Sequence, residues 1–186
     1  NLRGLIAKRK LFPCCFGSAL KLRGIEELLE GLDTYAPEKD YPAEFAAKVY
    51  KISRDPQGNR LTWLKVTGGS LKVRSVLRYV NLKGAGVEEK VLQLRHYSGE
   101  KFTAVEEAGA GQLVAVTGLA ETFIGQALGA EPEALTPALE PVMTYRVALP
   151  KGTDPAVVWP KLKQLEEEDP QLHLIQEAGQ IHVQIM

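Results

Sequence analysis

The feature that most constrains this chain is a series of short segments, each bounded by a turn signal, that runs from Phe45 to Leu128. Segments such as "RLTWLKVT" and "EEKVLQLRHY" have the length of strands, and many of their apolar and polar residues alternate. Glycine-containing turns separate segments at positions 68–69, 84–86 and 109–111. Because closure removes exposed strand edges, this pattern predicts a small closed β-barrel of about six or seven strands.

The residues before the barrel segment read as the end of an α/β unit. Leu11 to Phe16 form an apolar run that predicts a buried strand, and Gly24 to Leu32 carry an amphipathic helical pattern. Gly17, Ser18 and Ala19 predict a tight turn between the two. A parallel strand needs neighbouring strands and helices on both faces, so we expect residues 1–36 to end a larger α/β domain.

Two linkers and a third pattern complete the predicted organisation. Residues 37–44 combine prolines and charges without periodicity and are predicted to link this end to a barrel domain at 45–130. Residues 131–138 are predicted to be a second linker. Residues 139–186 follow the order strand, helix, hairpin, which is typical of an incomplete ferredoxin-like βαββ unit.

The helix of this last unit carries clear end signals and one contrary signal. Thr153 or Asp154 is predicted to cap it, with Pro155 in the first turn. Pro160 lies inside the helical pattern, which predicts either a kink there or a true start near Trp159.

Composition excludes several classes of protein. The formal net charge is zero and the pI is near 7.0, which argues against a dedicated, sequence-independent nucleic-acid binder and leaves room for a local basic patch. Cys14 and Cys15 have no partners at metal-ligand spacing, so we expect reduced core cysteines of a cytoplasmic protein. No membrane span or secretion signal is found, and the start at Asn1 suggests a fragment.

No catalytic or metal site is predicted within the chain. A GTPase needs a phosphate-cradling loop, a Mg²⁺-side Asp and an Asn-Lys-x-Asp element, and no coherent set is present. "DPQG" from Asp55 to Gly58 is interpreted as a turn. The three histidines, His96, His173 and His182, are interpreted as solvated rather than as ligands. "EEED" at Glu166 to Asp169 is predicted to be a solvated helix end, with a domain contact as the alternative.

The three patterns, in this order, resemble the translational GTPases of the elongation factor G family. "FPCCFGSALKLRGIEELLEGL" is similar to the end of their G domain, and "GNRLTWLKVTGGSLKVRSVLR" to their barrel hairpin. "VEEAGAGQLVAVTGL", "IGQALG" and "LEPVMTYRVALP" resemble later stretches of the same family, although Gln112 and Gln126 stand where it commonly has Asp at barrel turns. The short segment before "AAKVYKI" is most similar to the tetracycline ribosomal-protection proteins.

This resemblance implies a mixed multidomain chain: the α/β tail of a G domain, an elongation-factor-type β-barrel (domain II) and a partial ferredoxin-like unit (domain III). It implies that Ser18, Ala19 and Leu20 border guanine, with a backbone N–H bonding the base. It also implies that the barrel docks on small-subunit ribosomal RNA, where alternation along one predicted strand places three cations on one outward face: Lys72, Arg74 and Arg78.

The expected function follows from the same resemblance. The intact parent is expected to bind GTP or GDP with Mg²⁺, to hydrolyse GTP on the ribosome and to release bound tetracycline, while this chain, monomeric and without the phosphate loop, is expected to be inactive. Two alternatives stay open: a translocase of the elongation factor G type, and a ribosome-binding structural module with no nucleotide role.

Overall fold

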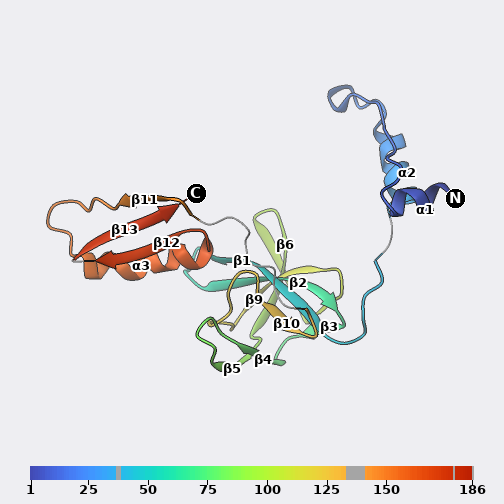
Figure 1. Cartoon of the computed structure of the whole chain (residues 1–186). Coiled ribbons are helices and arrows are strands. Elements are labelled where there is room, and N and C mark those ends of the chain that lie inside the picture. Colours follow the sequence, from blue (N-terminus) through green and yellow to red (C-terminus); the bar gives the residue numbers. More distant parts are fainter. Residues whose placement is uncertain (37–38, 133–140, 178, 186) are drawn as a thin grey trace. The chain divides into compact units, whose positions relative to one another are not determined.

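The chain forms two compact units in the computed structural model, which describes residues 1–36, 39–132, 141–177 and 179–185. One unit spans Asn1–Asp40 and the other spans Tyr41–Met186. Figure 1 shows the elements of both units.

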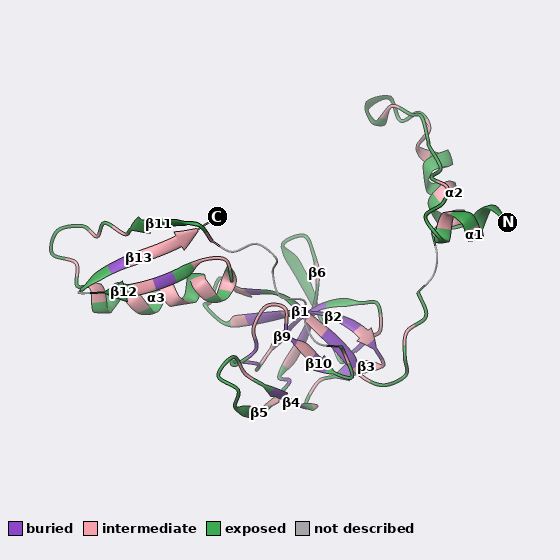
Figure 2. Cartoon of the chain, in the orientation of Figure 1, coloured by how far each residue is buried: buried purple, intermediate pink, exposed green. Residues whose placement is uncertain are grey.

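The first unit contains α1 (Leu2–Ala7), a 3₁₀ turn (Ala19–Lys21) and α2 (Ile25–Tyr35). The amphipathic helix predicted from Gly24 to Leu32 is confirmed, and it continues to Tyr35. Gly24 precedes α2 with a φ of 74°, the left-handed region that glycine adopts without strain. None of the described residues 1–36 is buried (Figure 2).

The predicted buried strand from Leu11 to Phe16 is wrong. The structure has no strand there, and the side chains of Phe12 and Phe16 are 73% and 93% exposed. Cys14 and Cys15 are free thiols, as expected, but they are exposed rather than in a core. A strand of this type forms its hydrogen bonds with neighbouring strands, and the described part of this unit provides none.

The second unit begins with the predicted barrel-type domain, whose strands form a six-stranded sheet and two strand pairs. The sheet has the order β10-β1-β2-β9-β6-β7, and the pairs are β3-β8 and β4-β5. The strands are β1 (Ala46–Arg54), β2 (Arg60–Gly68), β3 (Ser70–Lys72), β4 (Val76–Val80), β5 (Gly86–Lys90), β6 (Gln93–Ser98), β7 (Lys101–Val105), β8 (Glu107–Gly109), β9 (Leu113–Thr117) and β10 (Ala127–Gly129).

The described residues 45–130 contain ten strands rather than about six or seven, because three strand-like segments are each two strands: "SLKVRSVLRYV", "EEKVLQLRHY" and "KFTAVEEA". The segment "SLKVRSVLRYV" divides into β3 and β4 at Arg74, whose φ of 69° lies in the left-handed region and interrupts an extended strand. The predicted turns at Gly68-Gly69, Gly84 to Gly86 and Gly109 to Gly111 lie between or at the ends of strands.

One apolar cluster fills the interior of this domain, and Figure 2 shows the buried residues concentrated in its strands. Alternation along β2 directs Thr62, Leu64 and Val66 inward, each 0% exposed. Leu64 and Val66 belong to the cluster, which also contains Ala47, Val49, Ile52, Leu71, Leu77, Tyr79, Val91, Leu94, Ala108, Val114, Val116, Leu119 and Leu128.

The last elements are β11 (Met143–Arg146), α3 (Pro155–Glu168), β12 (His173–Glu177) and β13 (Gln180–Ile185). The sheet order is β11-β13-β12 with antiparallel pairs, so the chain places β13 between the two strands that α3 connects. This is the predicted βαββ arrangement of a split βαβ unit.

The helix α3 starts where its cap signals predict. Asp154 is the N-cap, and its carboxylate accepts a hydrogen bond from the Ala156 N–H at 2.8 Å, with Pro155 as first helical residue. The alternative start near Trp159 is wrong, since α3 continues through Pro160. Most of the predicted linker 131–138 lies outside the described residues, as do two residues of the linker 37–44.

Candidate functional site

The predicted guanine-binding turn is an ordered loop on the surface of the first unit. Ser18 N–H donates to the Arg23 carbonyl at 2.9 Å, and the Arg23 N–H donates back to the Ser18 carbonyl at 3.1 Å. Between these bonds, Ala19 and Leu20 lie in the 3₁₀ turn, and the Leu20 side chain is 95% exposed. Ser18 occupies the N-cap position of this turn without a side-chain capping bond. The loop therefore displays Ala19 and Leu20 on a backbone fixed from both sides.

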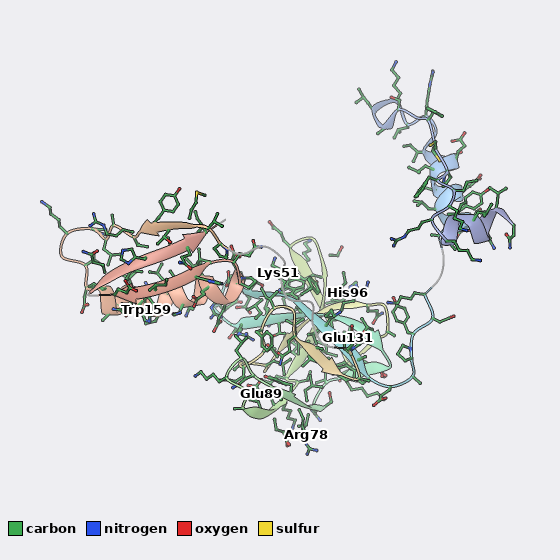
Figure 3. All side chains as sticks on the ribbon, in the orientation of Figure 1. Lys51, Arg78, Glu89, His96, Glu131 and Trp159 are labelled. Atoms are coloured by element: carbon green, nitrogen blue, oxygen red, sulfur yellow. The ribbon has the colours of Figure 1, made fainter. Side chains whose placement is uncertain are left out.

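The three cations predicted to share one barrel face do not form a single row. Lys72 ends β3 and Arg78 lies in β4, whereas Arg74 lies in the turn between them, so strand alternation does not relate the three. Figure 3 labels Arg78 on the β4–β5 side of the domain, away from Lys51 of β1.

Two of these cations are paired with carboxylates. The Lys72 ammonium lies 3.6 Å from Glu107, and the Arg78 guanidinium lies 2.7 Å from Glu88 on the neighbouring strand. Hydrogen bonding from Ser70, followed by the charge of Lys72, lowers the pKa of Glu107. All of these side chains are exposed, so a competing phosphate would displace a weak surface pair rather than a buried one.

The turn between β1 and β2 is organised by a buried carboxylate. Asp55 is 8% exposed and accepts bonds from the Asn59 N–H at 2.8 Å, the Asn59 amide at 3.0 Å and the Gln57 N–H at 3.1 Å. Arg95 of β6 reaches the same carboxylate at 3.0 Å. The Asn59 side chain, with these other donors, lowers the pKa of Asp55. The "DPQG" turn interpretation is therefore confirmed, with Asp55 as its anchor.

A second guanidinium lies at the end of β2. Arg60 donates to the Leu119 carbonyl at 2.6 Å, to the Thr122 carbonyl at 2.5 Å and to the Thr122 hydroxyl at 2.9 Å. Thr62 completes the network, since its hydroxyl lies 2.9 Å from that of Thr122 and from the Arg60 guanidinium. Arg60 and Arg95 both line an open groove of about 410 Å³ together with Asn59, Leu92, Thr117 and Leu119.

Two residues of the acidic run contact other elements, Glu166 and Glu167, and the contacts of Glu167 with β1 and β2 favour the alternative interpretation, a domain contact. Glu167 lies 2.9 Å from the Arg54 guanidinium and 3.5 Å from that of Arg60. Glu166 accepts from the Leu174 N–H at 2.8 Å and contacts Lys163.

The two histidines of the β12–β13 hairpin lie on one face of their sheet. The register of β12 and β13 places His173 opposite Gln184 and His182 opposite Ile175, so both histidines share the sheet face opposite Leu174 and Val183. Among the residues that the structure describes, no group of three or more His, Cys, Asp or Glu side chains is placed to hold a metal ion. None of the helices in the described ranges has the length and apolarity to cross a membrane.

The two departures from the family pattern fit their turns. The side-chain Oε1 of Gln112 accepts from the Gly109 N–H at 2.9 Å, and the side-chain Oε1 of Gln126 accepts from the Phe123 N–H at 3.1 Å. A side-chain oxygen is what each turn requires, and Gln provides it as Asp would. Gln126 uses its amide as well, donating to the Val80 carbonyl at 2.8 Å.

Sequence reasoning missed a row of four aromatic side chains on the outer face of the six-stranded sheet, here called the aromatic row: Tyr50, Trp63, Tyr97 and Phe102. Successive ring centroids are 6.5, 4.8 and 5.3 Å apart. Each ring occupies a strand position whose side chain points away from the core. This alternation could have been used to predict from the sequence that the four rings face outward. Which strands are neighbours is not encoded locally, so the row itself was not visible in the sequence.

Comparisons with known proteins show what the barrel is similar to. Residues 44–131 match the family model described as elongation factor G domain 2. The chain is 31% identical, over 207 aligned residues, to elongation factor G 2 of Geobacter metallireducens, a match that covers 96% of this chain and 29% of that protein. A crystal structure of a Thermus thermophilus protein is similar with a TM-score of 0.74 and 26% identity, over 98% of this chain and 28% of that chain.

The chain spans under one third of the length of both relatives. The order of elements around the barrel agrees with the resemblance noted in the sequence, and the family model covers the whole predicted barrel, 45–130. Residues 44–131 are therefore similar to elongation factor G domain 2, and the match to elongation factor G 2 extends this similarity over nearly the whole chain.

Proposed function

We propose that this chain belongs to a ribosome-dependent GTPase of the elongation factor G type. The observation that carries the proposal is the domain 2 match at residues 44–131, flanked on both sides by elements in the order that this family has. The barrel is proposed to bind ribosomal RNA of the small subunit, through phosphate contacts that position the protein without reading sequence.

Ser18, Ala19 and Leu20 are proposed to border the guanine base. The hydrogen-bonded loop supports this role, because a backbone N–H held in place can donate to guanine O6, where adenine carries a donor instead. The sequence contains no coherent set of the phosphate-cradling loop, the Mg²⁺-side Asp and the Asn-Lys-x-Asp element that a GTPase needs. We therefore expect the 186-residue chain to hydrolyse no GTP by itself.

The whole protein tests this proposal directly. GTP hydrolysis is measured with and without purified ribosomes, and guanine specificity is measured by competition of ATP against labelled GDP. Stimulation by ribosomes together with preference for GDP is expected. A whole protein that binds no guanine nucleotide overturns both GTPase alternatives and leaves the structural module.

A second candidate is release of tetracycline, favoured by the short segment between α2, which ends at Tyr35, and β1, which begins at Ala46. Radiolabelled tetracycline retained on ribosomes is measured with and without protein and GTP. Loss of the drug when both are present supports ribosomal protection. Retention of the drug during active GTP hydrolysis supports the translocase, which the named relative, elongation factor G 2, also favours.

A further inference from the structure

We propose that the aromatic row is a stacking platform for unpaired RNA bases. The inference deepens the proposed ribosome binding: it names the residues of the barrel that take RNA and the form of RNA that they take. Aromatic side chains interleaved with cations on a sheet face bind single strands, because every base presents a π-face and every phosphate a charge.

The sheet register places the row on one face. Across the sheet, paired positions run from Lys51 in β1 to Trp63 in β2, then to Ala115 in β9 and Arg95 in β6. Tyr97 of β6 pairs with Phe102 of β7. Thr62 and Leu64, the neighbours of Trp63 in β2, are 0% exposed on the opposite, inward face. The row therefore faces out of the barrel.

Two local features bring the rings together. A register shift between Val49 and Lys51 makes Tyr50 the extra residue of a bulge, which allows Tyr50 and Lys51 both to lie outside the core. The small side chain of Ala115 lies between Trp63 and β6, which leaves room for the Trp63 and Tyr97 rings to approach to 4.8 Å.

The rings are held and yet accessible. The Trp63 indole N–H donates to the Ser53 hydroxyl at 2.8 Å, which fixes the plane of the ring. The rings of the row meet at interplanar angles of 59°, 42° and 41°, so each leaves part of a face uncovered by its neighbour. Tyr50 and Phe102, at the two ends, are 41% and 45% exposed. Holding large apolar rings at the surface in fixed planes prepares them for a flat partner.

The charges around the row favour RNA as that partner. The Lys51 ammonium lies 5.6 Å from the centre of the Trp63 ring, and the Arg95 guanidinium lies 4.4 Å from that of Phe102. Arg95 is neutralised by Asp55, but in the described part of the chain neither Lys51 nor Lys65 has an ion-pair partner. An apolar protein partner gains nothing from unpaired ammonium groups, whereas a phosphate backbone does.

The test uses the whole protein and the double variant Tyr50→Ala/Phe102→Ala, whose exposed end rings are removed without opening the core. Tyr145→Ala is the matched control, because Tyr145 is 51% exposed on β11 and outside the row. Binding is measured by anisotropy of a labelled 12-nucleotide polyuridylate strand and of a labelled blunt RNA duplex, and separately by co-sedimentation with ribosomes. Circular dichroism checks that each variant is folded.

The expected result is tighter binding of the single strand than of the duplex, with a loss of at least about tenfold for the single strand and for ribosomes in the double variant. The control should match the unmodified protein. Equal single-strand affinity of the double variant and unmodified protein overturns the platform. So does weaker ribosome binding with unchanged single-strand binding, which assigns the row to a protein partner. Absence of ribosome binding by the unmodified protein overturns the proposed function instead, and the single-strand comparison still decides the platform.

Discussion

Asp55 concentrates four polar contacts in one carboxylate, and this makes the stability of the barrel depend on pH. Its pKa is lowered in the folded protein, chiefly by Asn59, from an unfolded value near 3.8. A lowered pKa means that the stabilisation is fully present above the unfolded pKa and is lost as the pH falls through the folded pKa. We expect Asp55→Asn to flatten the acid side of a plot of urea midpoint against pH from 6 to 2. Parallel plots for the two proteins would contradict this role.

Among the cationic side chains at the barrel surface, removal of Arg60 should lower the free energy of unfolding the most. It is 14% exposed and satisfies the carbonyls of Leu119 and Thr122, which Arg60→Ala would leave without a donor. We expect a decrease of about 3 kcal/mol in the free energy of unfolding by urea. The exposed Lys65 in the same strand is the control, and Lys65→Ala should change the free energy by less than about 0.5 kcal/mol. Equal effects of the two substitutions would refute the network.

Sequence reasoning anticipated single residues where chemistry is local, as at the Asp154 cap and the Asp55 turn. In both, a carboxylate bonds N–H groups two to four residues away, so the neighbouring sequence carries the information. It failed for Arg74 because a positive φ at a non-glycine residue has no signature in alternation. The partners of Arg60 lie about sixty positions along the chain and are likewise invisible to local reading.

Among the elements, β10 depends on a glycine that closes its end. Gly129 has a φ of 65°, and a Cβ there would lie 2.2 Å from the Phe45 carbonyl oxygen, so Gly129→Ala meets both strain and a backbone clash. Gly84 also has a positive φ, 77°, but a Cβ there meets nothing within 4 Å. We expect Gly84→Ala to cost about 1 kcal/mol and Gly129→Ala about 3 kcal/mol of unfolding free energy, measured by urea denaturation. Similar costs would show that the β10 end relaxes around the methyl group.

The elements that sequence predicted best are those with a strong period or paired end signals. In β1 and β2, buried side chains that point into the core alternate with more exposed ones over much of each strand. The helix α3 begins after a capping Asp that is followed by Pro. The strand from Leu11 to Phe16 failed for a different reason: an apolar run records a preference for burial, and burial requires neighbours that the described residues do not supply.

The whole chain has an uneven distribution of burial, and its local stability should follow that distribution. Amides in β1, β2 and β9 lie in the middle of the six-stranded sheet over the apolar cluster, whereas none of the described residues of α1 or α2 is buried. Opening free energies approach zero where few apolar contacts hold a segment and approach the global value in a core. In the 186-residue chain we expect hydrogen exchange to be fastest in α1 and α2 and slowest in β2.

Hydrogen exchange measured on the whole protein tests why α2 is weakly protected. It distinguishes a helix that is unstable in itself from a helix that lacks the neighbouring part of the proposed G domain. The proposed G domain would cover the apolar side chains of α2, of which Leu28, Leu29 and Leu32 are 41%, 58% and 55% exposed here. Burial of these leucines should slow exchange in α2 by at least about tenfold, while β2, whose core is already complete, should change little. If α2 exchanges equally fast in both proteins, its exposed leucine face has no partner in the G domain and the assignment of residues 1–36 to that domain is wrong.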